Sequence, residues 1–228
     1  MAAVGNPPAT SWTSIPELAF RVERAEAARH SAVPAVRFGL HVDAVGGQAI
    51  RAILLEVQIQ IAARQRGYNE REEDLLQELF GAPERWSTTL RTLPWTRNTV
   101  IAPPFRGGTD IDLLVPCSYD LEVAGARYLA ALGDGVVPLE FLFSGSVFFS
   151  TPQGALQTTR IPSDCEASFQ LAVAVWREAM DRHFRGSAWL RLGRGRFEAL
   201  CAYRARHALA SWDATIDALL AEDESRGR

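Results

Sequence analysis

Alternating apolar and polar residues predict β-strands over much of the segment from residue 16 to 162. Two segments carry the strictest alternation, with apolar residues at Val36, Phe38, Leu40 and Val42 in the first and Ile53, Leu55, Val57, Ile59 and Ile61 in the second. Side chains at every second position of a strand share one face, so each segment has one buried face and one polar face. Because only the turn 45–48 separates the two strands, we expect them to pair side by side and antiparallel.

Further strands and one amphipathic helix follow from the same kind of pattern. Shorter strands are expected around residues 20–22, 110–115 and 138–150, with a hairpin turn at 151–154 leading into 155–161. Asn69 is a good N-cap for a helix that begins with acidic residues and ends before Gly81. Its apolar residues lie on one side, so we expect this short helix to lie across the sheet.

The pattern changes after residue 162. A strand over 166–173 and a helix over 174–184 are predicted, then a short strand over 188–192, a helix over 194–206 and a last helix that Ser211 caps. The predicted fold is α+β: an antiparallel β-sheet or sandwich with a short helix across it, followed by a mainly helical C-terminal region. The expected divisions are a flexible arm (1–15), a β-rich domain (16–162), a strand-helix C-terminal region (163–221) and a tail (222–228).

The stretch Leu93–Asp120 combines proline, glycine, tryptophan, arginine and aspartate more densely than the rest of the chain. We interpret it as a structured connection that delivers side chains to one edge of the sheet. Tryptophan and arginine dominate the energetics of protein interfaces. The sequence therefore predicts a partner-binding surface made of Trp86, Trp95, Pro103, Pro104, Phe105 and Arg106.

The amino-acid composition excludes several kinds of catalytic and metal-binding site. All 24 basic residues are arginine, which indicates a high-GC bacterial genome and excludes Schiff-base chemistry, a lysine general base and a P-loop lysine. The three cysteines are widely spaced and form no C-x-x-C pair, which argues against a disulfide framework or a zinc ribbon. With no long apolar run and no secretory signal pattern at the start, a cytoplasmic protein without a membrane span is expected.

Asp110 and Asp112 share one face of a predicted strand, close in sequence to Asp120 and Glu122. Paired carboxylates serve acid-base or metal chemistry, but that would need a histidine or a third carboxylate nearby in space. The polar face of an ordinary half-buried strand has the same pattern. The four histidines do not pair at helical ligand spacing. We therefore assign no catalytic, cofactor-binding or metal-binding residue, and we expect no cofactor.

Three other motifs are weak. Ser144-Gly145-Ser146 lacks the full nucleophile elbow, and Gly193-Arg194-Gly195 lacks the residues of a phosphate-binding loop. The segment 189–220 resembles a ribbon-helix-helix DNA-binding module and is locally basic through Arg191, Arg194, Arg196, Arg204 and Arg206. The formal net charge of −3 and the position of the segment argue against nucleic-acid binding.

Three motifs, PWTRNTVIAPPFRGGTDIDLLVPCSYDLEVAGARYL, VPLEFLFSGSVFF and AWLRLGRGRFEALCAYRARHALASWD, resemble a bacterial domain family of unknown function. The resemblance covers residues 16–221. This family occurs in Actinobacteria and other high-GC lineages, and its members tend to be encoded beside [NiFe]-hydrogenase structural and maturation genes. The resemblance implies a hydrogenase-associated accessory or maturation protein and implies no catalytic residues.

The N-terminal strands FRVERAE, VRFGLHV and ILLEVQIQI, followed by a helix, are also similar to the opening of SecB-type chaperones. Both resemblances imply the binding of another protein. The resulting hypothesis is a non-enzymatic accessory or assembly factor that binds a partner protein, a hydrogenase subunit or maturation factor. The alternatives are a DNA-binding regulator and a metal-dependent hydrolase that uses Asp110 and Asp112. The sequence does not indicate an oligomeric state.

Overall fold

The structure is a computed structural model that describes residues 15–118, 120, 123–185, 187 and 191–226. The chain divides into two compact units, Met1–Ala188 and Trp189–Arg228, which are described separately. The expected arm 1–15 lies outside the described residues except for its last position.

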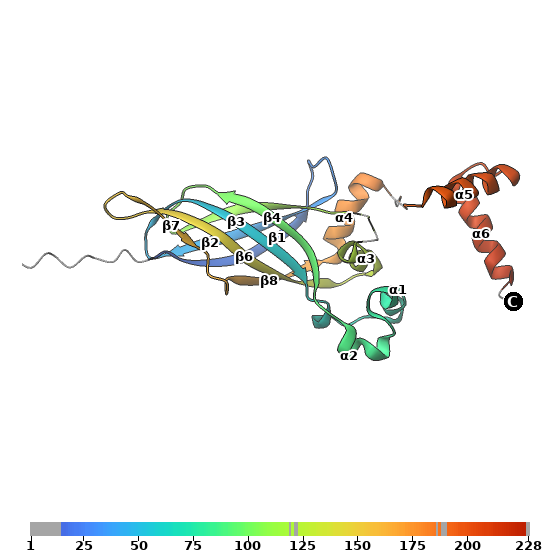
Figure 1. Cartoon of the computed structure of the whole chain (residues 1–228), viewed down its shortest axis with the longest axis horizontal. Helices are drawn as coiled ribbons and strands as arrows, with labels where there is room; N and C mark the ends of the chain where they lie inside the picture. The colour runs from blue at the N-terminus through green and yellow to red at the C-terminus, as the bar shows by residue number, and fades with distance from the viewer. Residues whose placement is uncertain (1–14, 119, 121–122, 186, 188–190, 227–228) are drawn as a thin grey trace, which may run out of the picture. The chain divides into compact units, whose positions relative to one another are not determined.

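The first unit contains two antiparallel sheets. Sheet A has the strand order β1-β2-β5, with β1 Glu17–Ala27, β2 Ala35–Val45 and β5 Gly108–Pro116. Sheet B has the order β4-β3-β6-β7, with β8 also paired to β6, and comprises β3 Ala49–Ile61, β4 Leu93–Ala102, β6 Val136–Ser150, β7 Leu156–Arg160 and β8 Glu166–Ala172. The strands can be followed in Figure 1.

The inner faces of the two sheets pack against each other as a sandwich. The rings of Phe20 and Phe143 stack with centroids 4.3 Å apart, and those of Phe38 and Phe141 meet edge to face at 5.2 Å. Each pair joins a strand of sheet A to a strand of sheet B. The alternating apolar residues predicted from the sequence form this core, and the predicted α+β fold with antiparallel strands is confirmed.

The expected side-by-side pairing of the first two long strands is wrong. Strand β2 pairs with β1 and β5, whereas β3 pairs with β4 and β6. The turn between them, where Gly46 and Gly47 have φ of 108° and 73°, carries the chain from one sheet to the other. Alternation shows which face of a strand is buried, but it does not show whether the next strand lies beside it or opposite it.

The segment Leu93–Ala102, expected to be part of a connection, is strand β4 at the edge of sheet B. Pro94 lies at a register shift opposite Gln60. Proline is compatible with an edge strand at such a position because no ladder hydrogen bond from its nitrogen is needed. The true connection is therefore shorter and runs from Pro103 to Gly107.

Four helices complete the first unit, and Figure 1 shows them at one end of the sandwich: α1 Glu70–Phe80, α2 Trp86–Thr89, α3 Ala124–Ala131 and α4 Val173–Phe184. Short 3₁₀ turns cover Ala63–Gln65 and Pro83–Arg85. The predicted cap is confirmed, because the Asn69 side chain accepts a hydrogen bond from the Glu72 amide in a complete capping box. Helix α1 packs against α3, which in turn packs against β4.

The second unit consists of α5 Arg194–Arg206 and α6 Trp212–Arg226. Ser211 caps α6 as predicted, since its Oγ accepts a hydrogen bond from the Ala214 amide at 3.0 Å. Most of the strand expected over 188–192 lies outside the described residues, and Arg191 and Leu192 are not in a strand. Among the described helices, none is long and apolar enough to cross a membrane.

Candidate functional site

The six residues of the predicted partner-binding surface lie in two different settings. Trp86 is buried in the helical end of the first unit, where its Nε1 donates a hydrogen bond to the Gly81 carbonyl at 2.8 Å. Its ring packs edge to face against Tyr68 at 5.2 Å and Phe80 at 6.0 Å. This tryptophan anchors α2 on its neighbours and has little surface to offer a partner.

Trp95 lies on β4 and is half-buried. Its ring packs edge to face on Phe38 at 6.1 Å, and a Cβ at Gly125 of α3 would lie 3.4 Å from the ring atom Cδ1. Trp95 therefore joins β4 to both the core and α3. Phe105 is opposite Ile50 at the other end of β3, roughly 30 Å from Trp95 at about 3.3 Å per strand residue.

The remaining four residues, Pro103, Pro104, Phe105 and Arg106, are consecutive in the connection between β4 and β5. Both prolines and Arg106 are exposed, and Arg106 donates a hydrogen bond to the Gly47 carbonyl at 3.1 Å. On the adjacent outer face of sheet B, Ile101 is 66% exposed and lies directly opposite the exposed Leu54. The structure thus brings four of the six predicted residues together beside an apolar cross-strand pair.

A polar network covers the outer face of sheet A. His41 of β2 is opposite Asp110 of β5, and its Nδ1 lies 2.5 Å from Asp110 Oδ1. The other ring nitrogen, Nε2, lies 3.2 Å from Oδ1 of Asp43, whose second carboxylate oxygen accepts a hydrogen bond from Arg21 at 2.6 Å. Acid-base or metal chemistry at Asp110 would need a histidine or a third carboxylate nearby, and His41 lies in that position.

These contacts shift the pKa values of two members. The hydrogen bond to Asp110 raises the pKa of His41 above its usual value, although partial burial opposes this. Burial alone would raise the pKa of Asp43, but hydrogen bonds from His41 and Arg21 outweigh it and hold the pKa of Asp43 below its usual value. Both shifts favour the charged forms of the two side chains.

Asp112 belongs to a different part of this face. It accepts a hydrogen bond from Arg24 at 2.8 Å and lies 3.6 Å from a guanidinium nitrogen of Arg37. The Arg24 guanidinium covers Gly39, where an added Cβ would lie 2.7 Å from it. Asp110 and Asp112 share a strand face as predicted, but the structure gives them different partners and does not form a paired-carboxylate centre.

Sequence reasoning missed Glu23 as a member of this face. Strand β1 shifts register between Val22 and Arg24, so Glu23 is the extra residue of a bulge. One ligand atom from each of Glu23, His41 and Asp110 can be chosen so that all three lie within 4.8 Å of one another. Strand parity could place His41 and Asp110 on polar faces, but no local sequence signal reveals the bulge or the pairing.

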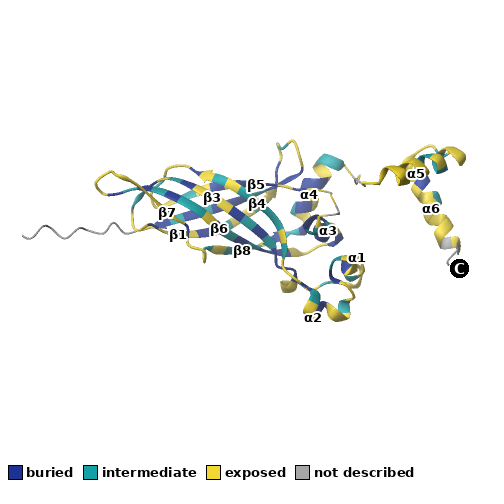
Figure 2. Cartoon of the chain, in the orientation of Figure 1, coloured by how far each residue is buried: buried dark blue, intermediate teal, exposed yellow. Residues whose placement is uncertain are grey.

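The α5–α6 unit carries an unusual share of exposed apolar side chains. Phe197 is 47% exposed, Trp212 37% and Leu220 59%. Figure 2 shows both helices almost entirely in the exposed colour, and Thr215 is the one buried residue among those described in this unit. Internal contacts are sparse: the Phe197 and Trp212 rings lie 5.6 Å apart, and the Arg204 guanidinium lies 4.6 Å above the Trp212 ring.

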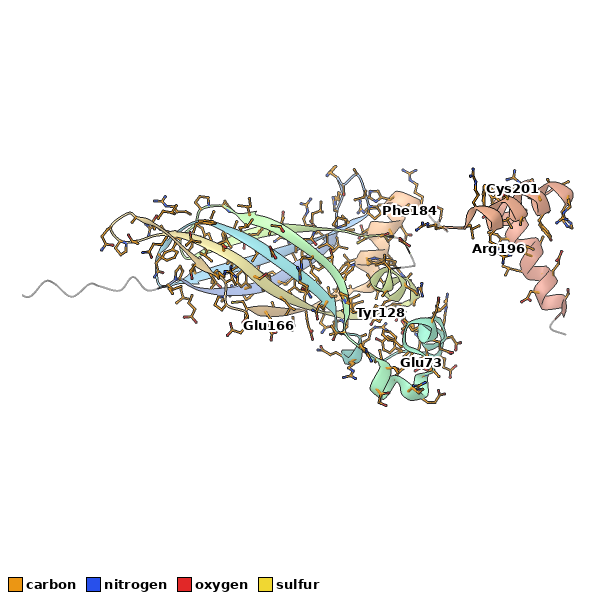
Figure 3. All side chains as sticks on the ribbon, in the orientation of Figure 1. Glu73, Tyr128, Glu166, Phe184, Arg196 and Cys201 are labelled. Atoms are coloured by element: carbon orange, nitrogen blue, oxygen red, sulfur yellow. The ribbon has the colours of Figure 1, made fainter. Side chains whose placement is uncertain are left out.

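The charged side chains of α5 are mostly basic, and those of α6 are mostly acidic. The basic side chains on α5 are Arg194, Arg196, Arg204 and Arg206, and the acidic ones on α6 include Asp213, Asp217, Glu222 and Asp223. Figure 3 labels Arg196 and Cys201 on α5. Tyr203 of α5 donates a hydrogen bond to Glu222 of α6 at 2.7 Å, which holds the two helices together at their polar side.

Together these features define an antiparallel β-sandwich with a helical end and a separate two-helix unit. Residues 15–228 match DUF6084, a family of unknown function, and the chain belongs to that family. No curated protein matches the chain.

Among solved structures, the CARDB domain of the PF1109 protein from Pyrococcus furiosus is similar at 10% identity, covering 72% of this chain and 96% of that one with a TM-score of 0.29. The putative ApaA protein from Bordetella pertussis matches at 9% identity, with 70% and 96% coverage and a TM-score of 0.23. A β-glucosidase from Kluyveromyces marxianus matches at 13% identity, with 68% and 15% coverage and a TM-score of 0.21. Likenesses at this level assign no function.

Proposed function

We propose that the protein is a cytoplasmic, non-enzymatic accessory factor that binds a partner polypeptide, and that the α5–α6 unit is its main docking element. The observation that carries this proposal is the apolar surface of the unit. Trp212, Ile216, Leu219 and Leu220 recur at the spacing of one helix face, and all four are exposed. An exposed apolar face of this kind is typical of an interaction site.

The small size of the unit supports the same conclusion. Two helices of 13 and 15 residues bury too little apolar surface to be stable by themselves in water. Covering the exposed face by a partner would supply the missing burial at about 25 cal/mol per Å² of apolar surface. Helices that present apolar residues at this spacing bind into apolar grooves of other proteins.

The charges on the two helices define the chemistry of such a partner. We expect an apolar groove or helix pair bordered by acidic residues beside α5 and by basic residues beside α6. The resemblance to a hydrogenase-associated family supplies the identity that we propose: a [NiFe]-hydrogenase subunit or maturation factor. This step rests on the resemblance and not on the geometry.

The connection Pro103–Arg106 is a second contact that we propose for the same partner. Its exposed prolines and arginine lie next to the apolar pair Leu54 and Ile101. Within this proposal Trp86 and Trp95 stabilise the sandwich by packing. At its other end Phe105 packs partly against the core, and Arg106 is exposed and can contact a partner.

DNA binding through 189–220 remains the alternative function, because α5 presents four arginines. The acidic side chains of α6 oppose the approach of a phosphate backbone. Salt-sensitive binding of a DNA duplex by the purified protein would favour this alternative.

A second copy of the chain is a rival occupant of the exposed face, since basic α5 and acidic α6 are complementary to each other. Light scattering of the purified full chain during size-exclusion chromatography separates the two cases. The proposal predicts a monomer that forms a complex when a purified hydrogenase subunit is added. A stable dimer that Ile216→Ser and Leu220→Ser convert to a monomer would overturn it.

A further inference from the structure

We propose that the outer face of sheet A binds a divalent transition-metal ion through Glu23, His41 and Asp110. One ligand atom from each residue lies within 4.8 Å of the others. Ligand atoms about 2.0–2.2 Å from a tetrahedral zinc ion are about 3.4 Å apart. Binding therefore requires side-chain rotations of roughly 1 Å that separate Asp110 from His41, now 2.5 Å apart, and bring Glu23 closer to both. Glu23 and Asp110 are exposed and free to make such rotations.

Two separate features of the backbone bring these residues together. Strand pairing sets Asp110 directly opposite His41, and the bulge in β1 adds Glu23 to the same face. Bulges redirect side chains at the sites where they occur. The cluster therefore combines residues from all three strands of the sheet, with no ligand on a loop.

Asp43 has the position of an orienting carboxylate. A histidine that ligates a metal through one ring nitrogen usually donates a hydrogen bond from the other nitrogen to a carboxylate or a carbonyl. His41 Nε2 lies 3.2 Å from Asp43 Oδ1 and can donate its proton there. Without an ion, Nδ1 shares a proton with Asp110 at 2.5 Å, and a bound ion would displace that proton and accept the Nδ1 lone pair. Arg21 in turn holds Asp43.

Gly108 provides the space for this arrangement. An added Cβ at Gly108 would lie 2.9 Å from His41 Nε2 and 3.2 Å from Asp43 Oδ1. Glycine at this position of β5 therefore lets the imidazole and Asp43 meet. Asp112 stays outside the proposed site because Arg24 and Arg37 engage it, and this makes it a matched control on the same sheet face.

The chemistry of the donors selects the class of ion. One imidazole and two carboxylates suit zinc better than calcium or magnesium, which prefer all-oxygen sites. Three protein ligands leave at least one coordination position for water or for a group from another molecule. The ion would balance the two carboxylate charges next to a neutral imidazole.

The test is a calorimetric titration of the full chain, freed of its affinity tag and of metal, with Zn²⁺ and in parallel with Mg²⁺. We expect one Zn²⁺ per chain, with affinity at least tenfold lower in each of Glu23→Gln, His41→Ala and Asp110→Asn, little change in Asp112→Asn, and weak or absent Mg²⁺ binding. Thermal unfolding of each variant without metal checks that the sandwich is retained, and Glu23→Gln is the mildest change.

Zinc that raises the unfolding temperature of the wild-type chain but not of the Asp110→Asn chain would support the site independently of calorimetry. Absence of zinc binding would overturn the inference. Binding that the ligand variants leave unchanged, or that Asp112→Asn weakens equally, would overturn it as well, because the first points to another site and the second to unspecific attraction. The docking proposal for α5–α6 does not depend on this result.

Discussion

Arg66 and Glu72 form a two-pronged ion pair in which the carboxylate is 2% exposed. Arg66 Nη1 lies 2.8 Å from Glu72 Oε2, and Nη2 lies 2.9 Å from Oε1. The Gly133 amide also donates to Oε1 at 2.8 Å, and Arg66 donates to the carbonyls of Asp134 and Val136. The buried ion pair thus joins α1, the segment after α3 and the start of β6.

Replacing Glu72 by glutamine should therefore destabilise the first unit strongly. The change leaves the half-buried guanidinium of Arg66 without its counter-charge, and breaking a buried pair in this way costs about 3 kcal/mol or more. Urea unfolding at pH 7 measures the difference. Glu70→Gln, in the same first turn of α1 but exposed, should change the free energy of unfolding by less than about 0.5 kcal/mol.

The same pair predicts how stability depends on pH. Burial alone would raise the pKa of Glu72, but hydrogen bonds from Arg66 and the Gly133 amide outweigh it and lower the pKa. A carboxyl whose pKa is depressed in the folded state contributes stability above its unfolded-state pKa, about 4.3, and loses it as pH falls through the folded value. The stability difference between wild type and Glu72→Gln should therefore shrink below about pH 4. A difference that stays constant down to pH 2 would contradict this account.

Gly145 should tolerate no side chain. Along strand β6, the residues before Gly145 pair with β8 and those after it pair with β7. Gly145 itself has φ of 132°. An added Cβ would lie 2.0 Å from the Leu54 carbonyl oxygen. We expect Gly145→Ala to cost more than about 3 kcal/mol, since strain and a backbone clash act together.

Gly154→Ala is the matched control for this change. Gly154 also has positive φ, 87°, but an added Cβ there would meet nothing within 4 Å. Strain alone should cost about 1 kcal/mol. Equal effects of the two alanines on the unfolding free energy would contradict the role assigned to Gly145.

The cysteines should differ sharply in reactivity. Burial raises the pKa of Cys117 to about 12, so almost no thiolate exists there at pH 8. Cys201 on α5 is half-exposed. Brief treatment of the native protein with iodoacetamide, followed by mass spectrometry, should label Cys201 and leave Cys117 unmodified until urea is added. Equal labelling of both in the native state would show that the sandwich around Cys117 opens readily.

Local features of this fold were predictable from the sequence. The capping box at Asn69 and the Ser211 cap are confirmed because a cap depends on residues within one helical turn. The inward faces of β2 and β3 are confirmed for a similar reason, since strand alternation is a local pattern.

Relations between distant segments were not predictable. The local sequence pattern is the same whether β2 pairs with β3 in one sheet or faces it from the other sheet. The predicted pairing of the two strands was therefore wrong. Trp86 and Trp95 lie in proline-containing sequence, yet a helix and an edge strand hold them in packed positions. The meeting of Glu23, His41 and Asp110 depends on a bulge and on pairing between segments far apart in the chain.

The measurement that tests the central claim most directly is capture of a purified [NiFe]-hydrogenase subunit from the same bacterium by the immobilised full chain. Wild type is compared with Ile216→Ser combined with Leu220→Ser, and with Leu156→Ser, which removes an apolar side chain of 64% exposure from β7. Circular dichroism should show unchanged helix content in all three proteins.

The account predicts capture by wild type and by Leu156→Ser, and affinity roughly 30-fold lower in the double variant, as expected when about 2 kcal/mol of interface energy is lost. Equal capture by the double variant, or no capture of a hydrogenase subunit or maturation factor by the wild-type chain, would contradict it.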